Sequence, residues 1–274
     1  MIIGGISAIV IGLTLGILGG GGSILTVPVF VYLLAMDTKL SIALSLGVVG
    51  ITSLVGSIQH FRNGNIDLKV AALFAPFSMA GTYAGAKIAS HIPGHLQLIF
   101  FAIIMLAASI YMLKPAKPST DTSLSSTVRN VLIAAEGIVV GIVTGIVGVG
   151  GGFLIVPALV LLTKTPMKKA IGTSLIIIAL KSMSGFYGYL DQVTVPWGFF
   201  FQFSAFTIVG ILAGAYLVKF ISQEGLKKGF AIFLIIMGLF ILYKNRKTFE
   251  SAMSLKDTPV VELVAANTKT DGRI

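Results

Sequence analysis

The sequence predicts an all-α integral membrane protein made of two homologous halves, and three observations support this fold class. First, 55% of the 274 residues are hydrophobic and only 11% are charged, whereas soluble domains carry about 25% charged residues. Second, apolar stretches near the ~20 residues needed to cross a bilayer recur along the chain. Third, a glycine-rich motif near the N-terminus is repeated after the middle of the chain.

The distribution of charge agrees with a membrane protein and excludes several other classes. The formal net charge is +10, but the basic residues lie in short loops between apolar runs, which is the positive-inside pattern rather than a nucleic-acid patch. The chain contains no Cys, which excludes disulfides, thiolate metal sites and cysteine catalysis. The sequence also has no nucleophile–base pair, metal cluster or phosphate loop. We therefore expect no enzyme activity, no cofactor or metal, and no nucleic-acid partner.

Polar segments divide the chain into two membrane repeats, a linker and a tail. Residues 1–113 form the predicted first repeat, and a stretch rich in Pro, Ser and Thr at 114–128 is the predicted linker. Residues 129–244 form the predicted second repeat, and we expect the polar tail 245–274 to be disordered. The apolar stretches fall at about 2–35, 40–59, 69–90, 96–113, 130–163, 170–190, 197–218 and 226–243.

The two halves share one glycine motif in the same register. Residues 12–33 read GLTLGILGGGGSILTVPVFVYL, and residues 141–162 read GIVTGIVGVGGGFLIVPALVLL. The aligned identities are Gly12/Gly141, Gly16/Gly145, Gly19/Gly148, Gly21/Gly150, Gly22/Gly151, Val27/Val156 and Pro28/Pro157. The same alignment continues through Ser45 and Ser174, which indicates a duplication rather than a shared composition.

In both halves the glycines interrupt an apolar run that would otherwise be one long helix. The run from Ile3 to Leu18 is about 24 Å long as a helix, and we expect a second short helix to begin at Pro28, whose fixed φ suits a first helical turn. Such a break is tolerated only inside the protein or beside water, because it frees backbone N–H and C=O groups. Two matching breaks indicate a transporter's binding site. The free N–H groups and positive dipole end of each half-helix favour an anion.

Each half contains either four crossings or a re-entrant hairpin with three crossings. If the broken run crosses the membrane, the halves are parallel and eight basic residues lie on each face. If it returns to its own side, the halves are inverted and eleven basic residues lie opposite five, a clear positive-inside bias. The eleven are Arg62, Lys69, Lys114, Lys117, Arg129, Lys164, Lys168, Lys169, Lys219, Lys227 and Lys228, and the five are Lys39, Lys87, Lys244, Arg246 and Lys247. We therefore expect inverted repeats, each with a broken re-entrant helix hairpin plus three transmembrane helices, with the linker cytoplasmic and both termini outside.

The breaks and nearby hydroxyl groups supply the candidate substrate-binding residues. These candidates are Gly19, Gly20, Gly21, Gly22, Ser23, Thr26, Gly150, Gly151, Gly152, Ser45, Thr173 and Ser174. The alternative is that the glycines only permit close helix packing and that the hydroxyls bond to their own helix backbone. Packing is the preferred interpretation for Gly81/Gly85 and Gly210/Gly214, which have the four-residue spacing typical of helix contacts.

Lys181 is a strong base well inside an apolar run, at the position that Thr52 occupies in the first half. Ionisable residues at that depth are costly and are functional by default. We expect Lys181 to bind or gate an anion, and the alternative is a lysine that reaches the membrane interface. Glu136 is a weaker candidate, for proton coupling. The three histidines flank loops and are expected near the interface rather than in a site: His60, His91 and His95.

The doubled motif resembles that of the TauE/SafE sulfite exporter family, also described as the 4-toluene sulfonate uptake permease family. The resemblance rests on the aligned glycines, on the Val-Pro that follows each set, and on Thr173-Ser174-Leu175, which is degraded to Leu44-Ser45-Leu46 in the first half. It covers about residues 1–244. It implies an integral membrane permease for small sulfur-containing anions such as sulfite, sulfoacetate or other organosulfonates.

The sequence and the resemblance together predict a secondary permease for such an anion, working by alternating access of the two repeats. The alternatives are a selective anion channel and a transporter of another organic anion. The expected partners are the anion and the lipid bilayer, and the expected location is the cell (inner) membrane, crossed several times. The identity of the anion, the direction of transport, the coupling ion and the formation of a homo-oligomer are left open.

Overall fold

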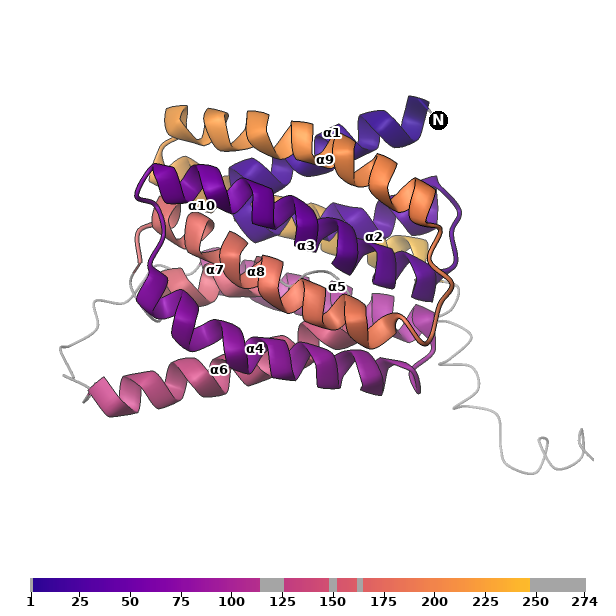
Figure 1. Ribbon diagram of the computed structural model, residues 1–274, viewed down its shortest axis with the longest axis horizontal. Coiled ribbons are helices and arrows are strands. Elements are labelled where there is room, and N and C mark those ends of the chain that lie inside the picture. Colours follow the sequence, from indigo (N-terminus) through magenta and orange to yellow (C-terminus); the bar gives the residue numbers. More distant parts are fainter. Residues whose placement is uncertain (1, 114–125, 148–151, 162–164, 247–274) are drawn as a thin grey trace, which may run out of the picture.

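The protein is a bundle of helices in a computed structural model, which describes residues 2–113, 126–147, 152–161 and 165–246. Most helices run side by side along one common direction, and the loops lie at the two ends of the bundle (Figure 1). Most of the predicted linker and most of the predicted tail lie outside the described residues. The fold is therefore all-helical, as the sequence predicts.

The first half begins with a helix, a short irregular helical segment and three longer helices. Its elements are α1 (Ile2–Leu18), the 3-10 turns of η1 (Gly19–Leu25), α2 (Thr26–Pro28), the π-helical turn η2 (Val29–Leu33), α3 (Thr38–Arg62), α4 (Leu68–Ala89) and α5 (Gly94–Leu113). Aspartates fix two of the helix starts. The Asp37 carboxylate accepts the backbone N–H groups of Lys39 and Leu40, and Asp67 does the same for α4.

The second half repeats this order. Its elements are α6 (Ser126–Val147), α7 (Gly152–Leu161), α8 (Met167–Tyr189), α9 (Trp197–Leu217), η3 (Val218–Phe220) and α10 (Gln223–Lys244). Pro166 and Pro196 directly precede α8 and α9, and the Ser222 hydroxyl accepts the Gly225 N–H to cap α10. By the sequence alignment, α6, α8, α9 and α10 are the counterparts of α1, α3, α4 and α5.

The second helical segment of each hairpin does not begin at its proline, and that expectation was wrong. In the first half helical turns run from Gly19 through Pro28 to Leu33. In the second half α7 begins at Gly152 and contains Pro157 in its interior. Proline has no backbone N–H to donate inside a helix. A wider π-helical turn directly follows Pro28 and changes the hydrogen-bond pattern there. The half-helices therefore start at the glycines themselves.

The two halves are packed together by exchanging helices. α1 of the first half packs against α9 of the second, and α6 of the second packs against α4 of the first (Figure 1). α3 packs against its own counterpart α8, and α5 packs against α10. This pairing is unchanged when the two halves are swapped, so the halves are related by an approximate two-fold axis.

Glycines let the exchanged helices touch through their backbones. A Cβ added to Gly16 would lie 2.5 Å from the carbonyl oxygen of Ile211, and a Cβ on the equivalent Gly145 would lie 2.2 Å from that of Thr82. The glycines with the same role on α4 and α9 are Gly81, Gly85, Gly210 and Gly214. The packing role predicted from their four-residue spacing is confirmed.

The chain after α1 turns back to the end of the bundle where α1 began. A Cβ on Gly22 would lie 2.0 Å from the backbone nitrogen of Leu15, so the chain folds onto α1 at the break. Gly19 permits this reversal with a φ of +61°, in the left-handed region that favours glycine. At the open end of the hairpin, a Cβ on Gly4 would lie 4.0 Å from the Leu34 side chain.

α3 and α8 are equivalent helices, and they pack in opposite directions. A Cβ on Gly50 would lie 2.8 Å from Sδ of Met183, in the second half of α8. At the other end of the contact, a Cβ on Gly172 would lie 3.0 Å from Cβ of His60. The start of α8 therefore lies beside the end of α3, and the contact between these two helices is antiparallel.

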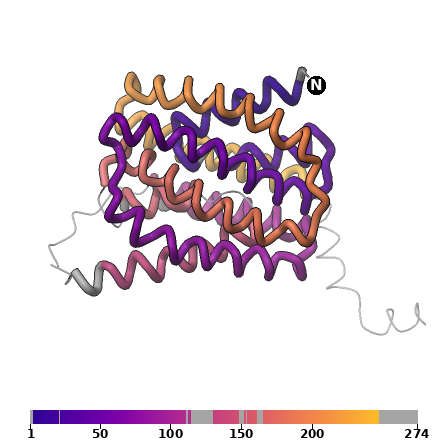
Figure 2. Tube along the Cα trace, viewed as in Figure 1, coloured from indigo at the N-terminus to yellow at the C-terminus, as the bar shows by residue number. Residues whose placement is uncertain are grey.

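Contacts between loops divide the helix ends into two groups. At one end, the backbone N–H of Asp67 donates to the Thr173 hydroxyl over 2.8 Å, which joins the α3–α4 loop to the start of α8. At the opposite end, Lys87 pairs with Asp191, and its hydrogen bond lowers the pKa of the Asp191 carboxyl. The α3–α4 and α8–α9 loops lie at opposite ends of the bundle (Figure 2).

Five helical segments of the described residues are long and apolar enough to cross a membrane. They are Thr38–Arg62, Asn130–Val147, Met167–Tyr189, Trp197–Phe220 and Gln223–Lys244. The chain is therefore a multi-pass membrane protein. α4 and α5, which the prediction counts as crossings, are not in this set, although they have 22 and 20 residues.

Candidate functional site

The two glycine breaks meet in the interior of the bundle. A Cβ added to Gly20 would lie 1.9 Å from Cα of Gly152, so the two backbones are in direct contact. Only residues without side chains permit this approach. Of the other predicted break residues, Gly19 and Gly22 are buried in η1, Gly21 also lies in η1, and Gly150 and Gly151 lie outside the described residues.

One side of α8 lies against both breaks. A Cβ on Gly19 would lie 3.0 Å from Oγ of Ser174, and a Cβ on Gly152 would lie 2.3 Å from Cδ1 of Ile178. Lys181 follows Ile178 by three residues, which is close to one helical turn, or about 5 Å along the axis. The predicted lysine and the predicted breaks are therefore neighbours in space.

Lys181 is completely buried, with 0% of its surface exposed. Its ammonium donates a hydrogen bond to the Thr144 hydroxyl at 3.2 Å, and Thr144 in turn donates to the carbonyl of Gly141 at 3.0 Å. Thr82 on α4 lies 3.5 Å from the same hydroxyl. No carboxylate of the described residues pairs with Lys181. The alternative interpretation, a lysine that reaches the membrane interface, does not fit this burial.

The two-fold relation puts Lys181 at the centre of the molecule. In the antiparallel register of α3 and α8, Gly50 lies beside Met183, and the midpoint falls near Thr52 and Lys181, which are equivalent in the two halves. Thr52 lies 2.7 Å, hydroxyl to hydroxyl, from Thr207. Lys181 is the equivalent of Thr52, whereas Thr144 aligns with Leu15 and Thr207 with Ser78, so the site is chemically asymmetric.

Four threonines of this centre were not among the predicted site residues. They are Thr52, Thr82, Thr144 and Thr207. A signal for one of them was available in the sequence, because Thr144 aligns with Leu15 and is the polar member of that pair. The others look like ordinary membrane-helix threonines, whose hydroxyls bond to their own backbone. Thr82 and Thr207 do make such bonds, to the carbonyls of Ser78 and Ser204.

Several buried hydroxyls around the breaks have no hydrogen-bond partner among the described residues. They are those of Thr26, Ser41, Ser45, Ser53, Ser182 and Ser204. A buried polar group without a partner costs about 1–3 kcal/mol, so these hydroxyls are available to a polar ligand. Ser53 and Ser182 are equivalent residues on α3 and α8.

The other predicted hydroxyls have bonds to the protein. Ser23 donates to the Gly20 carbonyl at 2.6 Å, and Ser174 donates to the Ile171 carbonyl at 2.8 Å. Thr173 accepts the backbone N–H of the α3–α4 loop described above. These three residues stabilise the backbone of the breaks and of α8. An anion would have to replace these hydrogen bonds in order to bind their hydroxyl groups.

Glu136 and two of the histidines lie away from this centre. Glu136 is half-buried on α6, eight residues or about 12 Å along the helix from Thr144. His91 and His95 are exposed. His60 differs from the expectation of an interfacial residue, since only 1% of its surface is exposed.

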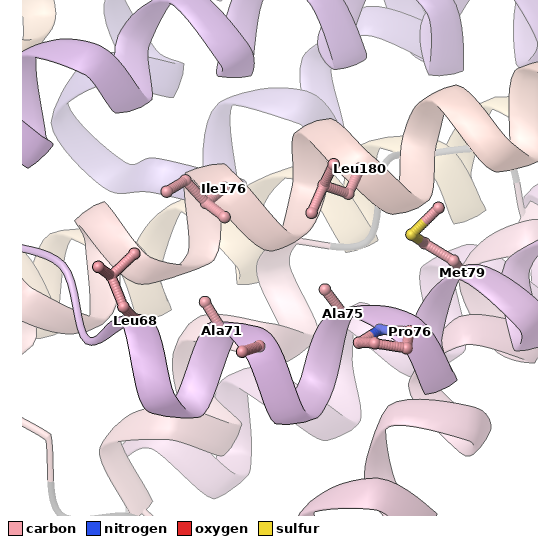
Figure 3. Close-up of a pocket in the computed structure, with 8 residues that line it drawn as sticks. Leu68, Ala71, Ala75, Pro76, Met79, Ile176 and Leu180 are labelled. Carbon is pink, nitrogen blue, oxygen red and sulfur yellow. The ribbon is translucent and has the colours of Figure 1, made fainter.

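A groove between α4 and α8 does not have the chemistry of an anion site. It encloses about 270 Å³, and in Figure 3 apolar side chains of both helices border it. Its lining residues are Leu68, Ala71, Ala72, Ala75, Pro76, Met79, Ile176 and Leu180. No charged or hydroxyl side chain is among them, so the polar centre at Lys181 is the better candidate. No cluster of metal-ligating side chains occurs in the described residues.

Comparison with known proteins is consistent with this arrangement. The sequence model of a family described as "Sulfite exporter TauE/SafE" matches residues 5–241. A probable membrane transporter protein of Xylella fastidiosa is 28% identical over 240 residues, which are 86% of this chain and 92% of the relative. The probable membrane transporter protein YdhB of Bacillus subtilis is 26% identical over 239 residues, or 85% and 96% of the two chains. No solved structure matches this chain.

Proposed function

The chain belongs to the TauE/SafE sulfite exporter family of membrane transporters, and from this premise we propose that it is a secondary permease for a small sulfur-containing anion. Sulfite, sulfoacetate and other organosulfonates are the substrate class. The anion binds where the two glycine breaks meet, between α3 and α8, with Lys181 as its charged partner.

The observation that carries this proposal is the burial of Lys181 without a carboxylate. A buried ammonium is costly unless it is paired, and no described carboxylate pairs with it. An ammonium has three N–H donors, and the described residues supply one hydrogen-bond acceptor, Thr144. A sulfite or sulfonate group offers three oxygens and a negative charge, which match both vacant donors and the uncompensated charge.

Alternating access is supported by the way the two halves are built. The equivalent helices α3 and α8 are antiparallel. At each end of the bundle, a hydrogen bond joins two chain segments that inverted repeats would place on the same face of the membrane. Lys168 donates to the Lys219 carbonyl at one end, and Asn245 donates to the Tyr32 hydroxyl at the other. In an inverted pair of repeats, rocking one half against the other opens a central site to each face in turn.

The test is thermal stabilisation of the purified protein by a panel of sulfite, sulfoacetate, taurine and simple carboxylates. A ligand that binds the folded state raises the melting temperature by mass action. We expect at least one sulfur-containing anion to stabilise the protein, and the carboxylates to do so less. Stabilisation by a cation or a neutral solute, with no response to any sulfur-containing anion, would overturn the proposal.

A further inference from the structure

His60 is a buried ionisable residue that the proposed binding site does not yet use. It lies in the last turn of α3, with 1% of its surface exposed. Neither Nδ1 nor Nε2 has a hydrogen-bond partner among the described residues. A neutral imidazole has one donor and one acceptor, and leaving both unpaired in the protein interior is costly. The ring therefore requires a partner from outside the described residues.

His60 lies close to the first glycine break. Its Cβ is 3.0 Å from the position of a Cβ on Gly172, and a Cβ on Gly19 would lie 3.2 Å from Cα of Ile171. His60 and Gly19 thus contact consecutive residues of α8. His60 therefore lies near Gly19, where the chain turns.

The equivalent residue in the second half shows what a fixed side chain does at this position. Tyr189 aligns with His60, and its hydroxyl lies 3.1 Å from the carbonyl of Gly145 and 3.4 Å from that of Ile146. This hydroxyl donates to the end of α6, directly before the second break. The two-fold relation directs His60 toward the end of α1 in the same way. The tyrosine hydroxyl forms a hydrogen bond next to the second break, whereas the imidazole near the first break has no hydrogen-bond partner among the described residues.

The charged groups at this end of the bundle leave the imidazole without an ion pair. The charged groups of this region lie at the end of its own helix and at the adjoining helix ends: Arg62 on α3, Asp67 and Lys69 at α4, Lys168 and Lys169 at α8, Lys219 after α9, and Glu224, Lys227 and Lys228 at the start of α10. All are exposed or half-exposed. Residues 2–25, which include α1 and the first break, contain no titratable side chain. None of the described residues forms a salt bridge with His60.

We propose that His60 takes up a proton from water when the anion binds at the first break and releases it to water when the anion leaves. The inference rests on the proposed function and adds a coupling ion to it. His60 lies eight residues, or about 12 Å along α3, from Thr52 at the level of Lys181, so it contacts the anion at a second position on its path and not together with Lys181. The protonated ring has two N–H donors and a positive charge, so it forms charge-assisted hydrogen bonds with a sulfonate that the neutral ring does not. Anion and proton are then bound together, and transport of one moves the other.

The test measures protons and anions in the same sample. Sulfoacetate is added to purified, weakly buffered protein at about pH 7, and the pH change is read together with the heat of binding. The wild type is expected to take up a proton, to a maximum of about one per anion, and to bind roughly 10-fold more weakly at about pH 8 than at about pH 6. H60Q is expected to take up none and to lose the pH dependence. H91Q and H95Q, on exposed histidines, serve as matched controls and keep both properties.

A second variant and a second measurement keep the test decisive if H60Q does not fold. H60Y copies the tyrosine of the other half and is expected to bind without proton uptake. The chain has three histidines, so the H91Q/H95Q double variant leaves His60 as the only one, and its ¹⁵N imidazole signal reports protonation directly. A shift to the protonated form on adding sulfoacetate supports the proposal.

Three results would count against it. Sulfoacetate binding with no proton uptake in the wild type overturns the coupling role and leaves the proposed function standing. Proton uptake that persists in H60Q or H60Y assigns the proton to another group. A wild type that binds none of the sulfur-containing anions contradicts the coupling role and the proposed function together.

Discussion

Lys181 and Thr144 form the polar centre of this protein, and their surroundings explain what each contributes. The lysine comes from α8 and the threonine from α6, so their 3.2 Å hydrogen bond joins two helices of the second half at the point where the break begins. Thr144 donates its own proton to a backbone carbonyl, which leaves its lone pairs free for the ammonium. The threonine therefore fixes the direction of the ammonium, while the charge itself remains uncompensated by a described carboxylate.

Replacing Lys181 with methionine is expected to weaken anion binding by about 10- to 100-fold, which corresponds to the loss of a hydrogen bond to a charged group. The fold is expected to survive, because exchanging a buried charge for an apolar side chain of similar length is often neutral or stabilising. Affinity is measured by calorimetry with the anion that stabilises the wild type, and folding by the melting temperature. Lys169→Met, on an exposed lysine of the same helix, is the control and keeps full affinity. Unchanged affinity in Lys181→Met would assign this lysine a purely structural role.

Thr144→Val removes the hydroxyl that orients the ammonium while nearly preserving the shape of the side chain. We expect roughly 5-fold weaker anion binding, less than for Lys181→Met, because the charge remains but is free to change direction. Thr144→Ser restores the hydroxyl and is expected to restore affinity. Thr14→Val is a matched control, since Thr14 bonds only to carbonyls of its own helix, those of Val10 and Ile11. Equal affinity of the valine and serine variants would refute the orienting role.

At the scale of the elements, the contact between the two breaks decides whether the halves can come together. Gly20 and Gly152 touch through their backbones, and each belongs to a different hairpin. This contact brings the backbone amides at the start of η1 and of α7 into one small region. A side chain on either glycine would separate the hairpins and disperse those amides.

Gly20→Ala is therefore expected to destabilise the protein by about 3 kcal/mol, since overpacking a filled interior costs this much when the backbone cannot shift. The change is measured as a lower melting temperature and as loss of anion binding. Gly229→Ala is the matched control, because nothing lies within 4 Å of the Cβ it would add, and alanine is favoured over glycine inside a helix by up to ~1 kcal/mol. If Gly20→Ala were as stable as Gly229→Ala, the contact between the breaks would not be essential.

The sequence predicts the helical elements well, because each is marked by local chemistry. Aspartates cap α3 and α4, and the duplicated glycines mark both breaks. The positions at which the helical segments resume after the breaks were not predictable, because neither proline starts its segment: Pro28 ends α2 and Pro157 lies inside α7. The alignment of Thr144 with Leu15 marks this threonine as unusual. Its pairing with Lys181 was not predictable, since the two lie 37 residues apart and are brought close only when α6 packs beside α8. The burial of His60 was not predictable either, because a position in the last turn of a helix is typical of an exposed residue.

At the scale of the whole molecule, two nearly equivalent halves enclose a centre that is not symmetric. Thr52 corresponds to Lys181, Leu15 corresponds to Thr144, and His60 corresponds to Tyr189. A symmetric scaffold makes the two end states of a rocking motion similar in packing. In the proposed mechanism, the asymmetric side chains give the anion one charged partner at the centre and one ionisable partner nearer the α3–α4 loop, so the two end states differ in chemistry while remaining close in packing.

The inverted arrangement predicts on which side of the membrane each loop lies, and single cysteines test it directly. Because the chain has no Cys, Asn63→Cys, His91→Cys and Glu224→Cys each introduce one thiol at an exposed position. In intact cells, we expect a membrane-impermeant maleimide to label only His91→Cys, and in inside-out vesicles to label Asn63→Cys and Glu224→Cys. His91 and Asn63 lie on opposite faces whether the halves are inverted or parallel, so that pair is the internal control. Only inverted halves put Asn63 and Glu224 on one face, and labelling of these two from opposite sides would establish parallel halves instead.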